Sequence, residues 1–451
     1  MVLARLLSPS EYGIVARVTV FTTFFSIFSD LGVGVAYIQK DNLSDSDRDS
    51  IFSFMVVVGI GLYLAFVLLG RGISWFYGDT VYNGIAWGVG LIVVMAAINV
   101  VPSSDLLKRH KFIFVNIVNA IATTISAIIA IFMAKNGFSY YALITQSVLN
   151  IAIPMVVFLL VVRPKFSFRI SRSSLGKVYE YSLGQLGFNF INYFSRNLDN
   201  LLVGKVFGET QLGYYDKAYK TTTYVMTNSS SIIGSSIQPV LARKQDDREY
   251  VFYHFKKTYL FLVVIGTWAA LACALCSREI IEFLYGEQWE CAIGPFVFLG
   301  ISLFSQMPLS CSGAFFQVLN ETILLAKTGF VGACILCTGI VIGLTRGTIT
   351  DVAKWYMIAQ LVAFIFMNII FEHKLFKKSF KIIYEVIVKE IVVFFLVFGL
   401  CKYLFINISI ESTFILLVVK FMILSILYLL FNFSLCNGKY IVDVFKKERR
   451  E

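Results

Sequence analysis

The run FIFVNIVNAIATTISAIIAIFMA, residues 112–134, decides the fold, because it is long enough to cross a lipid bilayer and contains no charged side chain. A helix of about 20 apolar residues spans the hydrocarbon core, and backbone groups in lipid must be hydrogen-bonded within their own segment. Comparable runs fill the rest of the chain. We therefore predict an all-α integral membrane protein with thirteen full spans, at 12–37, 51–70, 82–101, 112–134, 140–162, 180–204, 215–240, 257–276, 292–310, 323–345, 352–371, 386–405 and 413–433.

The composition supports this interpretation and excludes other classes of protein. Of the 451 residues, 58% are hydrophobic and only 15% are charged, and the mean hydropathy is +0.76. A single soluble core stops growing near about 250–300 residues, so a soluble chain could not bury this much apolar surface. A soluble enzyme, a disordered chain and a DNA-binding module are therefore excluded. We expect membrane lipids around the chain and no nucleic-acid partner.

The net charge of +11 follows from where the basic residues fall. The polar breaks between the spans alternate, so that one set contains 26 Lys and Arg residues and the other set contains 7. Cytoplasmic loops of membrane proteins are enriched in Lys and Arg. The first set includes the breaks around Arg48, Lys108 and Lys378 and the tail that ends at Glu451. We predict that these breaks and the C-terminus are cytoplasmic.

The sequence offers no catalytic, metal or cofactor site. Two CxxC pairs, Cys273/Cys276 and Cys334/Cys337, lie in apolar runs, where Cys behaves as a small hydrophobic residue. Metal and redox sites instead need exposed, polarised thiols. The three His residues stand in separate polar breaks, and no P-loop is present, so ATP is not expected to drive the protein directly. We assign no catalytic residue, no metal and no cofactor.

An internal repeat divides the chain. Gly13 in SPSEYGIVAR matches Gly213 in GETQLGYYDK at an offset of 200, and WFYGD (75–79) matches FLYGE (283–287) at an offset of 208. The second repeat contains six spans, an even number, so both repeats enter the membrane from the same side, as parallel transporter repeats do.

The repeat predicts the layout of the chain. We expect an N-terminal lobe at 1–165, a C-terminal lobe at 176–372 and an extra transmembrane hairpin with a basic tail at 380–451, the two parallel lobes surrounding a central cavity. The first repeat contains only five spans, and residues 1–7 correspond to the last turn of the second lobe's first helix. We therefore expect that the first helix is truncated, or that the true start lies upstream of Met1.

Several of these segments resemble one protein family. LARLLSPSEYG (3–13), FSDLGVGVAYIQ (28–39), RNLDNLLVGKVFG (196–208) and SSIQPVLARKQDD (235–247) are similar to the polysaccharide transporter branch of the multidrug/oligosaccharidyl-lipid/polysaccharide exporter superfamily. The resemblance implies a fourteen-helix form that lacks its first helix. It also implies a monomeric flippase that moves lipid-linked oligosaccharides, typically on undecaprenyl pyrophosphate, to the outer leaflet of the bacterial plasma membrane. Polymerases and glycosyltransferases of the same pathway are then expected partners.

A polar stripe follows one face of the span 180–204, at intervals of three and four residues. It consists of Ser182, Gln185, Asn189, Asn192, Arg196 and Asp199. Lipid does not tolerate such a face, so it must adjoin protein or a water-filled cavity. One interpretation is a structural ion pair between Arg196 and Asp199 that locks two helices. The other is a cavity wall, in which Asn192 and Arg196 contact substrate and Asp199 binds a coupling ion.

Four further side chains are candidates for function. Lys217 and Lys220 suit a pyrophosphate or an acidic sugar, although both could instead extend to the membrane surface. Arg17 matches Lys217 in the repeat and is included among the substrate-binding candidates. Asp30 lies in the apolar context FSIFSDLGVG, where it could bind a coupling proton or sodium ion or serve helix packing.

We expect a flippase for lipid-linked oligosaccharide repeat units, in which two lobes rock around a cationic cavity. A cation-coupled drug exporter of the same superfamily is one alternative, but its site should be net acidic, whereas this one is net basic. A membrane glycosyltransferase or polymerase is a second alternative. It would need a large outer loop with catalytic groups, and the predicted spans leave no room for one.

Overall fold

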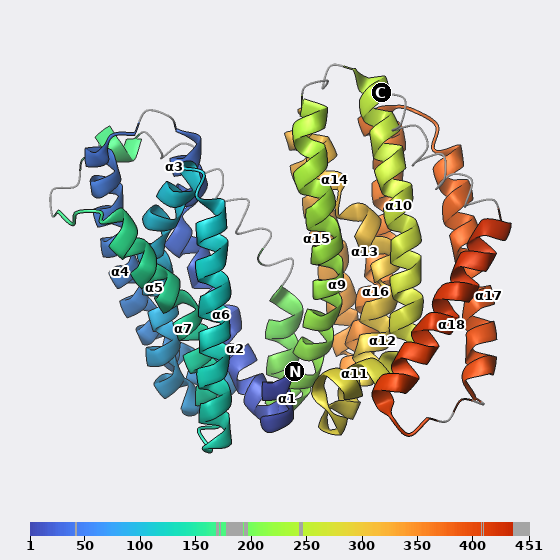
Figure 1. The fold of residues 1–451 in the computed structure, drawn as a ribbon, viewed down its shortest axis with the longest axis horizontal. Coiled ribbons are helices and arrows are strands. Elements are labelled where there is room, and N and C mark those ends of the chain that lie inside the picture. Colours follow the sequence, from blue (N-terminus) through green and yellow to red (C-terminus); the bar gives the residue numbers. More distant parts are fainter. Residues whose placement is uncertain are drawn as a thin grey trace. The chain divides into compact units, whose positions relative to one another are not determined.

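The computed structural model describes residues 1–40, 43–167, 171, 173–176, 193, 197–242, 247–406, 408 and 410–435. Throughout these ranges the regular structure is helical (Figure 1). The chain divides into two compact units, Met1–Gly213 and Tyr214–Glu451. The first unit includes residues 197–213 as well as the predicted N-terminal lobe, because these residues pack against the start of the chain.

Among the described residues, the first unit contains, besides a helical segment at 197–206, seven named helices and the first turns of an eighth. They are α1 (Val2–Leu6), α2 (Pro9–Asp30), α3 (Val33–Gln39), α4 (Asp45–Tyr77), α5 (Val81–Lys108), α6 (Phe112–Lys135), α7 (Tyr141–Val162) and the start of α9 (Gly208–Ala242). Ser8 and Glu11 form a capping box that begins α2, and Ser44 and Asp47 form the one that begins α4. Helix α4 ends at Gly78, which has a φ of 77°.

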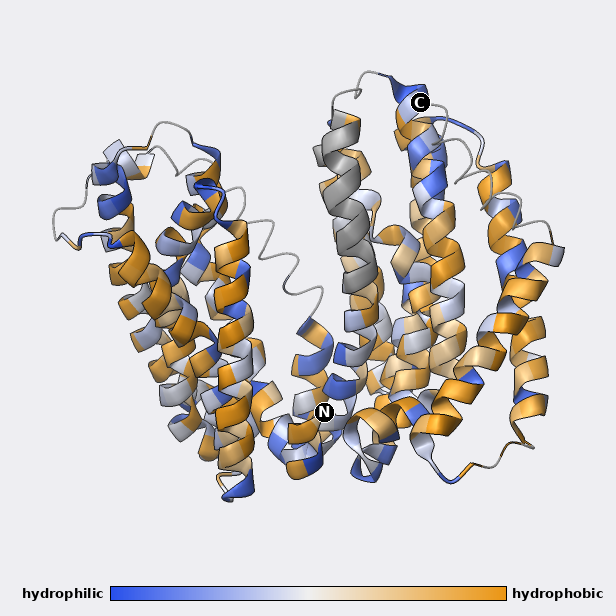
Figure 2. Cartoon of the chain, in the orientation of Figure 1, coloured by the Kyte–Doolittle hydropathy of each residue, from blue (hydrophilic) through white to orange (hydrophobic). Residues whose placement is uncertain are grey.

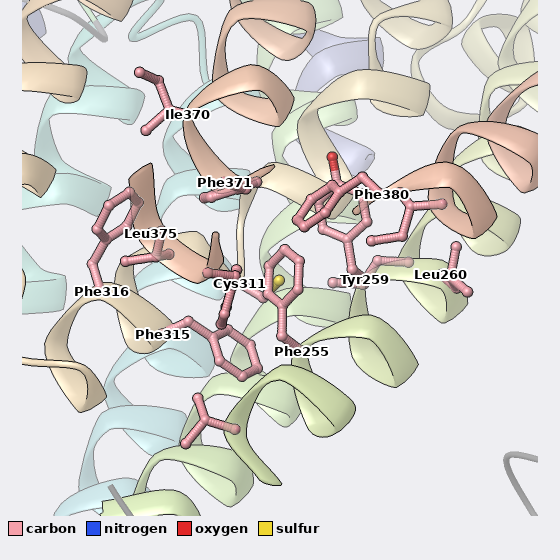
Figure 3. Close-up of a cluster of buried hydrophobic side chains, with 14 of the residues drawn as sticks. Phe255, Tyr259, Leu260, Cys311, Phe315, Phe316, Ile370, Phe371, Leu375 and Phe380 are labelled. Carbon is pink, nitrogen blue, oxygen red and sulfur yellow. The ribbon is translucent and has the colours of Figure 1, made fainter. Parts of the chain in front are cut away.

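The second unit continues α9 and adds shorter and longer helices. They are α10 (Arg248–Leu275), α11 (Ser277–Tyr285), η1 (Glu287–Ala292), α12 (Ile293–Ile301), α13 (Leu303–Leu309), α14 (Ser312–Val318), α15 (Thr322–Leu344), α16 (Ile349–Ile370), η2 (Phe371–Phe376), α17 (Lys381–Ile406) and α18 (Thr413–Ser434). The centre of its core is aromatic (Figure 3). Phe255 of α10 lies 5.1 Å from the ring centre of Phe315 in α14 and 5.1 Å from that of Phe371 in η2. Both contacts are edge-on, the favoured geometry for aromatic pairs.

Hydrophobic residues fill the long helices, and hydrophilic residues collect at helix ends and in loops (Figure 2). Within the described residues, nine helices are long and apolar enough to cross a membrane, and a bent pair makes up to ten. The chain is thus an all-helical, multi-pass membrane protein. The predicted count of thirteen spans is not reached in the part of the chain that the structure describes, and the span 180–204 lies mostly outside that part.

Two predicted spans are interrupted. The span 12–37 breaks after Asp30, where Leu31 and Gly32 both adopt left-handed backbone angles, with φ of 49° and 69°. The span 292–310 falls in the bent pair Glu287–Ile301 and Leu303–Val318, whose axes differ by 49°. Average hydropathy predicts which segments can lie in the lipid bilayer, but it does not predict where the helix within such a segment breaks.

Candidate functional site

Helix α2 crosses the start of α9 at two glycines that the repeat had matched. A Cβ atom added to Gly13 would lie 1.8 Å from the carbonyl oxygen of Glu209, and one added to Gly213 would lie 2.0 Å from the carbonyl oxygen of Pro9. Each residue pair is reciprocal, because Gly13 and Gly213, and likewise Pro9 and Glu209, are 200 positions apart. The offset found in the sequence is therefore also the symmetry of this crossing. Only glycine permits two backbones to approach this closely.

Arg17 is buried one turn beyond Gly13 and contacts several of the segments that meet at this crossing. Its Nη1 atom donates to the Tyr82 hydroxyl at 2.7 Å, and its Nη2 atom donates to the Gly204 carbonyl at 2.8 Å. The carboxylate of Glu209 lies 3.5 Å from Nη1. The guanidinium carbon lies 4.6 Å from the ring centre of Tyr77, within the range of a cation–π contact.

Two polar atoms beside Arg17 keep unused hydrogen-bonding capacity. Arg17 Nε and the Tyr77 hydroxyl are both buried, and neither has a hydrogen-bond partner among the described residues. Buried polar atoms are usually paired, so such exceptions point to a ligand, a water molecule or another state of the protein. The arrangement offers two donors to an oxygen atom placed beside the guanidinium.

Further contacts join the segment before α9 to the first helices. The Ser10 hydroxyl donates to the second carboxylate oxygen of Glu209 at 2.8 Å. Lys205 donates to the Phe76 carbonyl, and its ammonium lies 4.6 Å from the Phe76 ring centre. The cluster thus combines two cations, Arg17 and Lys205, with the carboxylate of Glu209 and several aromatic rings.

Asp30 lies at the break between α2 and α3. Its two carboxylate oxygens accept hydrogen bonds from the backbone N–H groups of Gly32 at 3.2 Å and Gly34 at 3.3 Å. These donors belong to the start of α3, so the carboxylate satisfies N–H groups that the helix cannot pair itself. Among the described residues Asp30 does not pair with Arg17, because the two side chains lie about 220° apart around α2, at about 100° for each residue.

Of the polar stripe predicted on the span 180–204, the structure describes only the last residue, Asp199. Asn192 and Arg196 lie outside the described residues, so the structure does not address the Arg196–Asp199 pair. Asp199 is buried in a helical segment, 197–206, and its carboxylate accepts a hydrogen bond from the backbone N–H of Asn200 at 2.8 Å.

In the second unit, Lys217 and Lys220 have different surroundings. The Lys217 ammonium lies 5.2 Å from the ring centre of Tyr285 and 5.6 Å from that of Trp289. Lys220 is exposed and forms an ion pair with the buried carboxylate of Asp216 at 2.7 Å. Lys217 therefore lies in an aromatic environment, whereas Lys220 extends outward one turn further along α9.

The sequence analysis missed the carboxylates that accompany these cations. Glu209 and Asp216 both belong to GETQLGYYDK, the segment that revealed the repeat. Asp216 could have been found, because it precedes Lys220 by four positions on a helix, the spacing of an ion pair. Glu209 could not, because its partners Ser10 and Arg17 are nearly 200 residues away.

Comparisons with known proteins identify relatives along most of the chain. A family model described as "Polysaccharide biosynthesis protein" matches residues 2–294. A membrane protein of the cps region of Klebsiella pneumoniae is 23% identical over 304 residues, which cover 64% of this chain and 60% of that protein. "Lipopolysaccharide biosynthesis protein WzxC" of Escherichia coli strain K12 is 24% identical over 303 residues, 65% and 60% of the two chains. The chain thus spans about 60% of the length of these curated relatives.

Solved structures share the fold at low sequence identity. The inward closed conformation of the lipid II flippase MurJ aligns with a TM-score of 0.71 and 16% identity, over 96% of this chain and 94% of that one. An inward-facing multidrug resistance transporter of the MATE family aligns with a TM-score of 0.60 and 14% identity, over 81% and 90% of the two chains.

Proposed function

The chain belongs to the polysaccharide biosynthesis protein family, and from this premise we propose that it is a flippase for lipid-linked oligosaccharides. The family match over residues 2–294 carries the proposal. The relative WzxC, named for lipopolysaccharide biosynthesis, supports it, and so does the shared fold with a lipid II flippase over 96% of the chain. The chain would act as a transporter and not as an enzyme.

The finer points of the proposal come from the family resemblance and from the pattern of the sequence. From the resemblance we propose that the carrier lipid is undecaprenyl pyrophosphate and that the movement is from the inner to the outer leaflet of the bacterial plasma membrane. The chain has thirteen spans, arranged as lobes at 1–165 and 176–372 and a hairpin at 380–451, with a cytoplasmic C-terminus. It works as a monomer, receiving its substrate from glycosyltransferases and delivering it to a polymerase.

Five side chains are proposed to hold the pyrophosphate and the first sugars. They are Arg17, Asn192, Arg196, Lys217 and Lys220. Of these, Arg17 has the most specific geometry. Its contact with Glu209 is 3.5 Å long, whereas a strong charge-assisted N–H···O bond is about 2.7–2.9 Å. A doubly charged diphosphate could therefore compete with this carboxylate, and Arg17 Nε and the Tyr77 hydroxyl would supply two further donors.

Asp30 and Asp199 are proposed to bind the coupling ion. A carboxylate has about four acceptor positions, and the backbone donors of Gly32 and Gly34 occupy two of those on Asp30. The remaining positions can receive a proton or a sodium ion. This idea predicts that the Asn variants transport without responding to a collapsed ion gradient, while wild-type transport responds.

The decisive experiment follows the lipid-linked glycan in cells and in vesicles. Arg17→Ala and Arg196→Ala should retain membrane insertion but lose surface polysaccharide, with lipid-linked repeat units accumulating on the inner leaflet. Arg71→Ala is the matched control, because Arg71 is an exposed arginine in the last turns of α4. Normal export by both cavity variants would remove these residues from the site, and absence of flipping by the wild-type chain in vesicles that contain its lipid-linked glycan would contradict the proposed function.

A multidrug exporter is the second candidate, because the fold also matches a multidrug resistance transporter with a TM-score of 0.60. The two functions separate in one assay. A drug exporter should lower the accumulation of organic cations in a pump-deficient strain, and the flippase should not. Arg17 and Lys205 together carry more positive charge than the Glu209 carboxylate beside them neutralises, which favours an anionic substrate.

A further inference from the structure

The hairpin α17–α18 is attached to α10 through polar side chains in an apolar surrounding. Glu390 of α17 is fully buried, and Tyr428 and Asn432 of α18 are 3% and 2% exposed. The adjoining cluster is hydrophobic and contains Leu271, Val393, Val397, Cys401 and Leu424. A carboxyl group in such a place is costly when it is charged, and it marks a functional position in membrane helices.

Three hydrogen-bonding contacts meet at the Tyr428 hydroxyl and the Glu390 carboxyl group. The Tyr428 oxygen lies 2.7 Å from the backbone carbonyl oxygen of Val264 in α10 and 2.8 Å from Oε2 of Glu390. Asn432 Nδ2 donates to Oε1 of Glu390 at 2.6 Å. Both distances at Tyr428 are those of good O–H···O hydrogen bonds.

The Tyr428 hydroxyl has two oxygen atoms within hydrogen-bonding distance, the Val264 carbonyl oxygen and Glu390 Oε2, but only one proton to donate. A tyrosine hydroxyl has one proton to donate, and a backbone carbonyl can only accept. If Tyr428 donates to Val264, the contact of 2.8 Å with Glu390 needs a proton from the glutamate. The Thr267 and Asn432 side chains also hydrogen-bond Tyr428, but these bonds supply no proton between Tyr428 and Glu390.

We propose that Glu390 is a proton-binding site, protonated in this structure and donating from Oε2 to the Tyr428 oxygen. The proton completes a chain from Glu390 through Tyr428 to the α10 backbone. The other carboxyl oxygen fits the same assignment. Oε1 accepts a hydrogen bond from Asn432 Nδ2 at 2.6 Å, so the proton is placed on Oε2, which faces Tyr428.

Charged groups also lie on the elements that pack against Glu390. On α17, Lys389 forms an ion pair with Glu385 at 2.7 Å. On α18, Lys420 pairs with Glu279 of α11 and lies 5.2 Å from the ring centre of Phe405. On α10, Lys256 and Lys257 lie about two turns before Val264.

If Glu390 lost this proton, a negatively charged carboxylate would lie in the contact between α10, α17 and α18, which we call the seam. Its Oε2 atom and the Tyr428 oxygen would then face each other without a proton between them. The seam would have to open or admit a cation. The site would therefore link the attachment of the hairpin to proton release, independently of whether the chain flips lipid-linked glycans.

Infrared spectroscopy of the full chain in lipid nanodiscs tests this assignment directly. The difference spectrum between wild type and Glu390→Gln at neutral pH should contain the carbonyl-stretch band of a protonated carboxylic acid, lost in the variant. Glu385→Gln is the matched control, because Glu385 lies on the same helix and has no place in the seam. That variant should keep the band. A difference spectrum that contains only carboxylate bands would overturn the proposal.

A second variant keeps the test valid if Glu390→Gln fails to fold. Tyr428→Phe removes the oxygen to which the acid is proposed to donate, so the carboxylic acid band should shift to the frequency of a weaker hydrogen bond. An unchanged band would contradict the assignment.

A third measurement follows thermal unfolding with pH. The unfolding temperature of the wild type should fall as rising pH removes the proton from Glu390. The unfolding temperature of Glu390→Gln should not show this fall, because glutamine has no such proton to lose. The same dependence of unfolding temperature on pH in both proteins would overturn the proposal.

Discussion

Arg17 contacts three separate parts of the first unit with one guanidinium group. Its two terminal nitrogens hold the Tyr82 hydroxyl and the Gly204 carbonyl, and the plane lies near the Tyr77 ring. The fork geometry makes this possible, because a guanidinium directs several donors at fixed angles, whereas an ammonium is a compact point charge. Charge and hydrogen-bond geometry thus contribute separately at this position, and a substitution can separate them.

Arg17→Lys should weaken the first unit although it keeps the charge. One ammonium cannot reach both acceptors, and each hydrogen bond to a charged group contributes about 1.5–3 kcal/mol. We expect a loss of about 2 kcal/mol in the free energy of unfolding, measured as a lower unfolding temperature in detergent or nanodiscs. Arg71→Lys, at an exposed arginine, is the control and should have little effect. Equal stability of the two variants would argue against the fork geometry.

At the scale of helices, the crossing of α2 and α9 depends on the absence of side chains. Gly13→Ala would place a Cβ atom 1.8 Å from the Glu209 carbonyl oxygen, and Gly213→Ala would place one 2.0 Å from that of Pro9. The helices would have to separate, and overpacking of this kind costs about 1–3 kcal/mol. We expect both variants to lower the unfolding temperature to a similar degree, because the contacts are reciprocal.

The control is Gly61→Ala, also inside a long helix, where an added Cβ meets nothing within 4 Å. Alanine exceeds glycine in helix propensity by about 1 kcal/mol, so this change should be neutral or stabilising. If Gly13→Ala and Gly61→Ala change stability in the same direction, the close approach of the two backbones is wrong.

The ion pair between α11 and α18 permits a double-mutant test. Glu279 and Lys420 are both nearly buried, with side chains 8% and 12% exposed. Removing one partner of a buried pair leaves an uncompensated charge and costs about 3–5 kcal/mol, whereas replacing both by apolar residues is often neutral. Glu279→Ala should therefore unfold at a lower temperature than the double variant with Lys420→Met. A double variant less stable than Glu279→Ala would show that the pair is not coupled in this way.

The sequence predicted the elements better than their breaks and contacts. Runs of apolar residues predicted the helices, and the offset of 200 predicted that Gly13 and Gly213 are equivalent. The break after Asp30 was not predicted, because it depends on backbone angles at Leu31 and Gly32, to which hydropathy is insensitive. The partners of Arg17 were not predicted either, since Tyr82 and Gly204 are distant in the chain and only the folded helices bring them together.

At the scale of the whole molecule, the distribution of charge determines orientation in the membrane. The 26 Lys and Arg residues of one set of breaks against 7 of the other exceed what a random distribution would give, and basic loops stay on the cytoplasmic side. The structure defines the helix ends next to several of these breaks, so the predicted orientation can be tested at known positions. Lys378 follows η2, and Gly78 and Gly286 end α4 and α11.

Reporter fusions test this orientation. A fluorescent protein that matures only in the cytoplasm should be bright when fused after Lys378 or after Glu451, and a phosphatase active only outside should be active at Gly78 and Gly286. Both reporters are used at each position, so that every fusion controls for its own expression. The physical reason is the cost of moving several cations across the bilayer, about 2.5–3.5 kcal/mol for each Lys or Arg at the centre of a helix. The reversed pattern would place the basic breaks outside, and it would reverse the proposed direction of flipping with them.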